Sequence, residues 1–469
     1  MGMPSISIAF KEKAVTAITR SQRGIIACII EDENYAAFLD NPYIMYDIND
    51  LPDGLSVKNQ KQVELMFKGY QTAPSKILMF VSEPVAGTTQ TTPAKATVSA
   101  PEGVDKGTVS IHEDSLYTGI VGKSIVITIT TAGEAGTAKF KWKVNDEKNS
   151  EEISTGENIK LIDGVAVDFS GNFTANDVYT ISCVPETVTL NPYKEILDKL
   201  EHERFDYLVI PAIEDDDKSV IATWIKSMRS VSDKMIKAVL PNIAADSEGI
   251  VNFTNTMIKT SESEETFTTK DYCSRIAGII CGTPMTISCT YAPLAEVIDC
   301  DKYSKEEMDN KVNAGELFIF TNGKQFRISR GVNSFITTVQ DKGESFKKIK
   351  KVDAMDMIHD DIRDTIDESY IGKYSNSYNN KCLLITAING YFYGLANDGI
   401  LNPDYDNRAD FNITKIKEYL MSRGYYTKEE LSQMKDVEIA KLDTDDKVFL
   451  LANIKILDAM EDVSLEINI

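Results

Sequence analysis

The sequence has no long hydrophobic run, and this shortage excludes a membrane-spanning helix. The longest apolar stretches, such as Gly24 to Ile30 and Ile276 to Cys281, fall far short of the roughly 18 residues that a spanning helix needs. The opening residues, MGMPSISIAFKEK, lack a basic region followed by an apolar core, so we expect no signal peptide. We therefore predict no membrane insertion and a protein that stays in the compartment where it is made.

Cysteine and histidine are too scarce and too scattered for a disulfide framework, a metal site or a catalytic centre. The seven cysteines, an odd number without a CxxC pair, indicate a reducing compartment. Only three histidines are present, His112, His202 and His359, and none has a plausible nucleophile beside it. We predict no catalytic residue, no metal and no cofactor.

Three local motifs resemble ligand sites but have the wrong context. The segment Gly119 to Ser124 resembles half of a phosphate-binding loop, yet Tyr117 stands where that loop needs glycine, and a strand follows instead of a helix. The carboxylates of Glu214 to Asp217 are consecutive and splay apart, which favours a solvated loop capping the next helix. Gly278 and Gly282 predict close packing of a helix and not a dinucleotide site.

The chain carries 72 acidic and 50 basic residues, a formal net charge of −22. Such a surface repels nucleic acid, because phosphate binding depends on clustered lysine and arginine. It favours solubility or a basic partner. The length of 469 residues indicates two to four domains, and a hydrophobic content of 42 % is ordinary for globular domains.

Alternating strands and helices in residues 21–82 and 191–345 predict an α/β core around a largely parallel sheet. The predicted strands and helices are GIIACII within Ser21 to Glu31, Ser56 to Tyr70 with Val57, Val63, Met66 and Phe67 inward, Lys76 to Ser82, Tyr193 to Glu203, Tyr207 to Pro211, Lys218 to Val231, Ile236 to Pro241, Ile250 to Phe253, Thr269 to Gly282 and Ser304 to Ala314. Asn322-Gly323 predicts a hairpin between Leu317 to Thr321 and Gln325 to Ser329.

Residues 83–190 interrupt this pattern and predict a linker followed by a small, surface-exposed β-sandwich inserted in the core domain. Glu83 to Gly103 is rich in threonine, alanine and proline, which is typical of a linker. Short alternating strands follow, and Trp142 within KFKWKV is the predicted centre of their core. These strands are Thr108 to Ile111, Ser124 to Thr131, Lys139 to Asn145, Ile159 to Ile162, Val165 to Phe169 and Val178 to Cys183.

Residues 346–457 predict a C-terminal α+β domain. A first helix, capped by Asp353, has an apolar stripe and a second face of aspartates that we expect to be solvated. The stripe is Met355, Ile358, Ile362 and Ile366, and the aspartates are Asp356, Asp360, Asp364 and Asp367. A second helix, Tyr378 to Leu395, is apolar on most sides and should be central. Shorter helices at Ile413 to Ser422 and Thr427 to Met434, then a strand at Val448 to Leu457, complete the region.

Both ends of the chain show the period of two that a half-buried strand needs. The apolar members are Ile6, Ile8 and Phe10 at one end, and Val463, Leu465, Ile467 and Ile469 at the other. A strand leaves N–H and C=O groups unpaired until it joins a sheet. Either each end docks in its own domain, or residues 1–20 and 458–469 are arms that pair with another molecule. Lys11 to Arg20 and Asp458 to Asp462 are then the candidate hinges.

The order of segments resembles the tail sheath proteins of contractile phage tails and related bacteriocin particles. The resemblance is carried by PSISIAFKEKAVTAITRSQRGIIACI, SRIAGIICGTPMTISCTYAPL, ELFIFTNGKQFRISRGVNSF and the segment from KKIKKVDAMDMIHDD to LLITAINGYF. It covers nearly all of the chain except about Glu83 to Leu190. The overall expectation is an α/β and α+β multidomain chain, whose C-terminal domain is completed by strands exchanged between subunits.

The resemblance implies a structural subunit and no enzyme. It implies self-assembly into hexameric rings, stacked as a six-start helix around a tail tube protein, with baseplate and tail terminator proteins as further partners. Assembly would occur in the cytoplasm of the bacterial host, and contraction would drive the tube through a bacterial envelope. Residues that could face the tube are the basic cluster Lys347, Lys348, Lys350 and Lys351, or the acidic face of Asp356, Asp360 and Asp364.

Two other functions remain open at this point. An α/β enzyme with an inserted β-domain would need a pocket with converging polar groups and a perturbed base, for which the sequence offers no candidate. A surface adhesion protein could use the β-sandwich but would need a route out of the cell.

Overall fold

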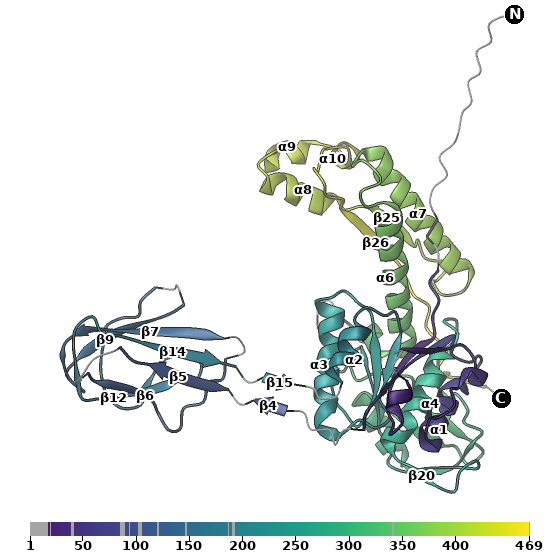
Figure 1. The fold of residues 1–469 in the computed structure, drawn as a ribbon. Helices are drawn as coiled ribbons and strands as arrows, with labels where there is room; N and C mark the ends of the chain where they lie inside the picture. Colours follow the sequence, from purple (N-terminus) through teal and green to yellow (C-terminus); the bar gives the residue numbers. More distant parts are fainter. Residues whose placement is uncertain are drawn as a thin grey trace, which may run out of the picture. The chain divides into compact units, whose positions relative to one another are not determined.

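The computed structural model describes residues 17–18, 20–38, 42–84, 90–92, 94–101, 106–119, 122–145, 148–185, 187–189, 193–339 and 342–468. It divides into two compact units, one formed by Met1–Val85 with Glu195–Ile469 and the other by Ala86–Lys194. The larger unit carries an α/β sheet and a C-terminal group of helices, and the smaller unit is made of strands (Figure 1). No helix in the described ranges is long and apolar enough to cross a membrane.

A seven-stranded sheet with the order β2-β3-β1-β16-β17-β18-β22 forms the centre of the larger unit. All neighbours are parallel except β2 and β3. The strands are β1 Ile25–Glu31, β2 Tyr43–Met45, β3 Lys76–Ser82, β16 Tyr207–Val209, β17 Lys237–Pro241, β18 Ile250–Phe253 and β22 Glu316–Leu317. The central strands are buried on both faces, which explains their continuous apolar sequences and confirms the predicted parallel sheet.

Helices cover both faces of this sheet, with α1 and α4 on one side and α2 and α3 on the other (Figure 1). They are α1 Val57–Phe67, α2 Lys194–Leu200, α3 Asp215–Ser230 and α4 Thr269–Cys281. A Cβ atom at Gly278 would lie 2.2 Å from the backbone oxygen of Met66, so glycine permits the predicted close packing of α4 on α1. Val57 was expected to face inward but is exposed, because it is the first residue of α1.

Smaller elements complete the α/β part. They are β19 Ile258–Thr260, β20 Thr266–Phe267, β21 Val297–Cys300, α5 Lys305–Asn313, β23 Ile319–Thr321 and β24 Phe326–Ile328. Ser304 and Glu307 form the predicted capping box at the start of α5. Gly323, at a φ of 83°, makes the predicted hairpin turn between β23 and β24.

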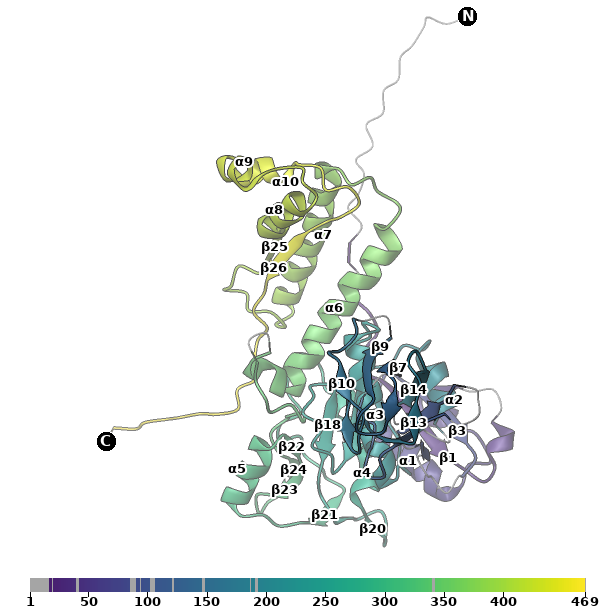
Figure 2. The ribbon, with the colours of Figure 1, turned by 90° about the vertical axis from the view of Figure 1, so that its left-hand side faces the viewer.

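Two long helices dominate the C-terminal region, and α6 extends from the α/β sheet toward the other C-terminal helices (Figure 2). The elements are α6 Ile349–Ser369, α7 Tyr378–Asn397, β25 Arg408–Phe411, α8 Ile413–Ser422, α9 Lys428–Gln433, α10 Asp436–Ala440 and β26 Leu450–Asn453. The predicted central helix is confirmed as α7. Helix α6 begins at Ile349, so Asp353 is not its cap as predicted but lies in its second turn.

The smaller unit consists of two antiparallel sheets that share one hydrophobic core. The five-stranded sheet has the order β10-β9-β7-β14-β5 and the three-stranded sheet the order β11-β12-β6, and two further strand pairs are β13-β8 and β15-β4. The strands are β4 Gln90–Thr92, β5 Lys95–Ser99, β6 Thr108–Ile111, β7 Lys123–Thr131, β8 Gly133–Glu134, β9 Lys139–Val144, β10 Ile153–Ser154, β11 Ile159–Lys160, β12 Ala166–Ser170, β13 Asn172–Phe173, β14 Val178–Val184 and β15 Thr187–Thr189. The rings of Phe140 and Phe169, 4.6 Å apart, join the two sheets.

Two predictions for this unit are wrong. The predicted linker Glu83 to Gly103 contains β5, which pairs with β14 as an edge strand rich in alanine, threonine and serine. Trp142 was expected to fill the core, but it is only half-buried, whereas Phe140 is fully buried. Both residues point to the same face of β9, so the alternation identified the face and not the residue that fills the core.

Candidate assembly site

The C-terminal region presents a two-stranded sheet, β25 with β26, against α7. The register pairs Arg408 with Asn453 and Ala409 with Ala452, and the side chain of Ala409 is buried toward the helix. Such a pair has two outer edges, where backbone N–H and C=O groups need partners. An edge whose groups have no partner is open to a further strand.

The outer edge of β25 is occupied by a side chain from α7. The N–H of Ala409 donates to Asn389 Oδ1 at 2.7 Å, and Asn389 Nδ2 donates to the carbonyl of Ala409 at 3.1 Å. Because backbone groups alternate sides along an antiparallel strand, Ala409 points away from β26. The amide of Asn389 therefore takes the place of a neighbouring strand at this position.

The outer edge of β26 is open. The N–H of Asn412 donates to the carbonyl of Phe449, so by alternation the backbone groups of Leu450 and Ala452 point away from β25. In the described part of the chain no hydrogen bond is made to these outward groups. An extended segment can pair here without displacing any described residue.

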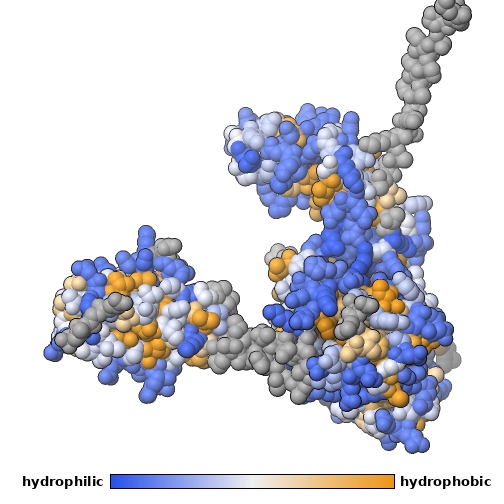
Figure 3. All heavy atoms as spheres, viewed as in Figure 1, coloured by the Kyte–Doolittle hydropathy of each residue, from blue (hydrophilic) through white to orange (hydrophobic). Residues whose placement is uncertain are grey.

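A groove of about 860 Å³ lies beside β26, between the end of α6 and the start of α7. Its apolar lining consists of Ile366, Tyr370, Ile371, Tyr374, Leu384, Val448 and Leu450. Several of these side chains pack at the margin of the core of α6 and α7 and are only partly buried. On the face drawn in Figure 3, a hydrophobic patch interrupts the hydrophilic surface of the lobe that carries α8 to α10. Side chains of a strand added to β26 would enter this groove.

The predicted arms differ in how much of them the structure describes. Ile6, Ile8, Phe10 and Ile469 lie outside the described residues. Val463, Leu465 and Ile467 are 84 %, 78 % and 74 % exposed, and residues 463–468 form no strand in the single chain. This C-terminal segment runs away from the body of the unit (Figure 2). Its apolar side chains are therefore free for a partner, and pairing with another subunit stays a prediction.

The basic cluster at the start of α6 is largely neutralised by the chain's own C-terminal segment. Lys348 Nζ lies 2.7 Å from a carboxylate oxygen of Asp458 and 3.4 Å from one of Glu461. Lys351 Nζ lies 3.3 Å from Asp458. Burial alone would raise the pKa of Asp458, but the nearby lysines outweigh it and lower that pKa.

The two other lysines of the cluster also have partners. Lys350 is buried and donates to the carbonyl of Leu457 at 3.1 Å, and burial lowers its pKa. Lys347 Nζ lies 2.8 Å from a carboxylate oxygen of Glu344. Contact of this cluster with a tube stays a prediction, but the charge that it can offer is small.

Arg330 fixes the next residues of the C-terminal segment. Its Nη2 donates to Asp462 at 2.6 Å, and its Nε lies 3.5 Å from Glu461. The buried Glu461 also accepts a hydrogen bond from Thr290 Oγ1 at 2.6 Å. Residues 458–462, predicted as a hinge, are thus held against the body, and we expect the arm to bend after Asp462. We call these contacts of 458–462 the arm-root clamp.

The prediction of a solvated acidic face on α6 is wrong for Asp356 and Asp360. Asp356 is 3 % exposed and Asp360 is 8 % exposed. Asp364 is half-buried and pairs with Arg204 at 2.5 Å, and Asp367 alone is exposed. Contact between this face and a tube stays a prediction, but Asp356 and Asp360 are turned toward the protein's interior and can contribute little to it.

Cations from the α/β part form ion pairs with these aspartates: Arg229 lies in α3, Lys237 begins β17 and Arg23 precedes β1. Arg229 donates to both carboxylate oxygens of Asp356, at 2.8 and 2.9 Å, and Lys237 Nζ donates to the same group at 2.8 Å. Arg23 bridges Asp360, at 3.0 Å, and Asp206, at 2.8 Å. These contacts fasten α6 to the sheet, and we call them the α6 network.

Burial and charge act in opposite directions on the groups of this network. Burial would raise the pKa of Asp356, but Lys237 and Arg229 outweigh it and lower that pKa. Burial raises the pKa of Asp353, although Lys237 at 3.2 Å opposes this, and the carboxylate accepts a hydrogen bond from the hydroxyl of Tyr207. The network therefore holds Asp356 as a carboxylate paired with two cations, whereas Asp353 has a raised pKa and loses its proton less readily.

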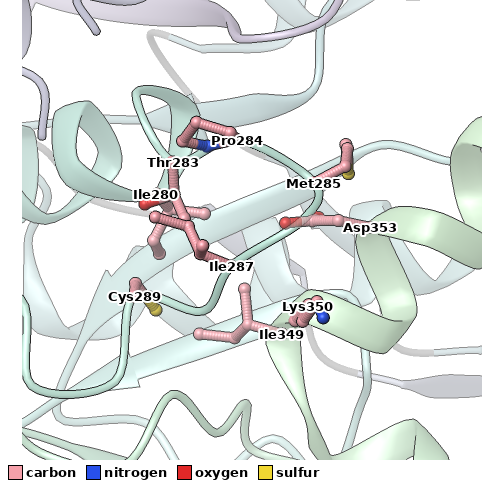
Figure 4. Close-up of a pocket in the computed structure, with 9 residues that line it drawn as sticks. All are labelled: Ile280, Thr283, Pro284, Met285, Ile287, Cys289, Ile349, Lys350 and Asp353. Carbon is pink, nitrogen blue, oxygen red and sulfur yellow. The ribbon is translucent and has the colours of Figure 1, made fainter. Parts of the chain in front are cut away.

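The position of the network argues against a catalytic role. Arg23 precedes β1, Asp206 precedes β16, and Lys237 begins β17, so all three lie at the amino ends of parallel strands. In open α/β sheets, ligands bind at the carboxyl ends of the strands. The pocket drawn in Figure 4 has a volume of about 10 Å³, room for about one water molecule, whereas Arg23, Asp206 and Lys237 line a neighbouring pocket of about 270 Å³. Figure 4 shows Asp353 of α6 pointing into the smaller pocket from one side.

Metal-binding groups do not converge in the described ranges, where no set of three histidine, cysteine, aspartate or glutamate side chains is placed to hold an ion. His112 pairs with Asp168, and His359 lies between Asp360 and Asp233, at 3.0 and 3.1 Å. Both histidines therefore have local ionic partners on their own unit.

Sequence reasoning missed Arg23, Arg229, Lys237 and Asn389. A lysine at the start of the predicted buried strand Ile236 to Pro241 was the one available signal, because a buried cation requires a charged partner. The sequence did not indicate a role for Asn389, because the backbone group that an asparagine in an apolar helix bonds cannot be predicted before the neighbouring strand is known.

Comparisons with known proteins agree on one family. The family model described as phage tail sheath protein central domain matches residues 186–334, and the model described as phage tail sheath C-terminal domain matches residues 341–469. The tail sheath protein of Clostridium phage phiCD119 is 40 % identical over 275 residues, which cover 59 % of this chain and 75 % of that protein.

Solved structures share the fold at low sequence identity. The sheath tail protein of Desulfitobacterium hafniense, 20 % identical, matches with a TM-score of 0.54 over 86 % of this chain and 91 % of that one. The helical sheath of the anti-feeding prophage in its contracted state, 10 % identical, matches with a TM-score of 0.56 over 100 % and 99 %. The enzyme alternative is therefore wrong: the chain belongs to the phage tail sheath protein family, a family of structural components of contractile tails and not of enzymes.

Proposed function

We propose that the chain polymerises as stacked hexameric rings, wound as a six-start helix around a tail tube, and contracts to drive the tube through a bacterial envelope. Membership of the sheath family supports this proposal, as does the likeness to a helical sheath in its contracted state. Other copies of the chain are the first partner, and tube, baseplate and terminator proteins are the others. Assembly takes place in the cytoplasm of the bacterial host.

The link between subunits is a strand exchanged through the terminal arms. The observation that carries this proposal is the coexistence of an open edge on β26 and an exposed apolar segment at Val463, Leu465 and Ile467. A strand added to β26 gains main-chain hydrogen bonds worth about 0.5 to 1.5 kcal/mol each, net. Its alternate side chains enter the groove beside β26, so hydrogen bonding and apolar burial act together.

Burial of the arm contributes most of the energy of the link. Each of the three side chains contributes about 1.5 to 3 kcal/mol when fully buried, so the arm contributes about 5 to 9 kcal/mol. Ordering the segment opposes this by about 1 to 2 kcal/mol per residue. A single link is therefore weak, and a lattice in which every subunit both donates and accepts an arm is stable. Such head-to-tail contacts grow into rings or helices.

Contraction requires bodies that stay rigid while their mutual contacts change. The α6 network supports this, because ion pairs join α6 to α3, to β17 and to the residues just before β1. The arm-root clamp directs bending to the residues after Asp462. The larger unit of each subunit then moves as one body that is linked to its neighbours by arms, residues 1–20 at the N-terminus and 458–469 at the C-terminus.

The unit Ala86–Lys194 is, in this proposal, a β-sandwich inserted on the outer surface of the sheath. Its two sheets share a core of their own, and both of its ends return to the α/β part. Residues 21–82 with 191–345 then form the core domain, and residues 346–457 form the domain that receives the arms.

The test is microscopy of the purified protein with two matched variants. Negative staining should show tubes or rings for the natural chain. Replacing Val463, Leu465 and Ile467 by serine should abolish them, while replacing the alternating polar residues Ser464, Glu466 and Asn468 by alanine should not. Both variants should leave the melting temperature of the body unchanged, because all six side chains are exposed. A natural chain that stays a compact monomer with both ends docked in its own sheet would refute the proposal.

A further inference from the structure

The groove beside β26 contains a cation without an ion-pair partner among the described residues. Lys381, near the start of α7, lines this groove and is only 6 % exposed. Its Nζ donates to Thr444 Oγ1 at 2.9 Å, and within the described ranges no carboxylate oxygen lies within 4.0 Å of it. Burial lowers the pKa of Lys381, although the charge of Asp443 opposes this. Because buried cations are normally paired, this end of the groove is suited to receive a carboxylate.

The two acidic residues that line the same groove already have partners. Asp445 accepts a hydrogen bond from the hydroxyl of Tyr419 at 2.7 Å. A carboxylate oxygen of Asp446 lies 3.1 Å from Lys447 Nζ. Lys381 is therefore the charged side chain of this groove that remains available to a group on an added strand.

The place of Lys381 determines where the carboxylate must lie on that strand. Thr444, its hydrogen-bond partner, and Val448, which lines the groove, both precede β26, so Lys381 lies beside the beginning of β26. Because β25 and β26 are antiparallel and purely antiparallel sheets are over-represented, we expect the added strand to be antiparallel to β26. Such a strand ends where β26 begins. It therefore needs apolar side chains along β26, followed by a carboxylate on the same face.

The N-terminal arm has this pattern in its sequence. Every second residue from Ile6 continues the same face of an extended strand, and these residues are Ile6, Ile8, Phe10 and Glu12. Three apolar side chains and the carboxylate that follows them would therefore enter the groove together. A carboxylate beside an ammonium group forms a charge-assisted hydrogen bond, which is among the stronger hydrogen bonds in proteins.

The helix-facing side of β26 is incompletely covered at the position where this arm would lie. Ala409 and Ala452 are paired across the two strands and so share a face, yet Ala409 is buried by α7 and Ala452 is exposed. An arm that brings Glu12 to the level of Lys381 covers this face. Its register on β26 is Glu12 with Val448, Phe10 with Leu450 and Ile8 with Ala452.

The C-terminal arm lacks the pattern. Glu466 lies on the face opposite to the three apolar residues of that arm, so the apolar side chains and the carboxylate cannot enter the groove together. Glu461 does share the face of Val463, but it is buried in the arm-root clamp of its own subunit. In contact with β26, the C-terminal arm would therefore leave Lys381 without an acidic partner.

We infer that the strand next to β26 comes from the N-terminal arm of a neighbouring subunit, and that Lys381 selects this arm by pairing with Glu12. This inference rests on the proposed exchange of arms, and it gives the two arms different places. The N-terminal arm pairs with β26, and the C-terminal arm pairs with the outer edge that the N-terminal arm then presents. Lys381 thus distinguishes two arms that both carry a row of apolar side chains.

A double-mutant cycle on the full-length chain tests the pairing of Lys381 with Glu12. The lowest protein concentration at which tubes form is measured by sedimentation. Glu12→Leu and Lys381→Met should each raise it about tenfold or more, because each leaves the other charge buried without its partner. The two substitutions together should restore assembly to within about threefold of the natural chain, since both charges are then absent. Glu466→Leu, the matched control on the C-terminal arm, should change the concentration less than about twofold.

The melting temperature of the unassembled protein separates this role from a structural one. Lys381→Met should not lower it, because the cation has no ion-pair partner in the described part of the single chain. If this variant does not fold, Glu12→Leu against Glu466→Leu still tests the inference.

Disulfide formation in tubes gives an independent readout. Ala452→Cys is combined with Ile8→Cys, or with Leu465→Cys as the control on the other arm. Opposed residues of an antiparallel pair have Cα atoms about 5.5 Å apart, within the range of a disulfide, so the pair with Ile8→Cys should bond in several-fold excess. Tubes grown from isotopically labelled and unlabelled copies show by mass spectrometry whether the bond joins two chains.

The outcomes separate this inference from the proposed function. Defects that cancel in the double variant, with an Ile8→Cys bond between chains, support the inference. Natural tubes combined with no defect in either single variant, with additive defects, with preferential bonding of Leu465→Cys, or with a bond inside one chain overturn it and leave the proposed function standing. A natural chain that forms no tubes overturns both.

Discussion

Replacing Asp356 by asparagine tests whether the α6 network is a structural joint. The carboxylate of Asp356 is 3 % exposed and accepts three hydrogen bonds from the two cations Arg229 and Lys237. Asparagine keeps the shape but removes the nearest counter-ion of both buried cations, so that Lys237 keeps only Asp353, at 3.2 Å, and Arg229 keeps only Glu248, at 3.8 Å. Removing one partner of a buried ion pair costs about 3 to 5 kcal/mol, because the remaining charge stays desolvated.

The matched control lies two turns further along the same helix. Asp364 pairs with Arg204, whose side chain is 48 % exposed, so Asp364→Asn should cost only about 0 to 1 kcal/mol. Urea unfolding followed by circular dichroism gives both free energies of unfolding. Hydrogen exchange should also rise in the first turns of α6 for the Asp356 variant only. Equal and small losses for the two variants would refute the reasoning, because they would mean that the network contributes no more than a surface pair.

Further predictions concern pH, the acceptor strand and the smaller unit. The hydrogen bond to Asp360 raises the pKa of His359, and the charge of Asp233 adds to this, whereas burial opposes it. The contribution of protonated His359 to stability is therefore full below pH 6.5 and is lost as pH rises through the raised pKa. His359→Gln should flatten that part of the plot of unfolding free energy against pH. Ala452→Pro removes an outward N–H of β26 and should abolish tubes while leaving the monomer folded, whereas Ala452→Gly should assemble; a tube-forming proline variant would show that arms pair elsewhere. Deleting Gly87 to Pro185 and closing the gap should leave assembly intact, and loss of tubes would show that the smaller unit is part of the lattice.

Local patterns in the sequence predicted the elements well where burial alone determines them. Both boundaries of the strand Lys76–Ser82 were predicted correctly. A continuous apolar run between polar residues indicates a strand that is buried on both faces of a parallel sheet. The capping box of Ser304 with Glu307 and the turn at Gly323 were predicted for a different reason, because their geometry depends on neighbouring residues only.

The environment of α6 could not be predicted from its own sequence. Aspartates at a helical spacing normally mark a solvated face, and the cations that bury Asp356 come from positions 119 and 127 residues away. The open edge of β26 was equally hidden, because it depends on the pairing of β26 with β25, about 40 residues away, and on the lack of a partner at the outward groups of Leu450 and Ala452 in the described part of the chain. Interactions between remote segments, rather than local propensity, therefore determine the candidate site.

The two hydrogen bonds between Asn389 and Ala409 limit the number of edges at which this sheet can accept a strand. Because an amide occupies the outer edge of β25 at Ala409, an added strand can pair with this two-stranded sheet only along β26. If an N-terminal and a C-terminal arm pair with the same two-stranded sheet, the second arm must therefore pair with the first arm and not with β25. In the proposed lattice, Asn389 thereby keeps all added strands on one side of the two-stranded sheet.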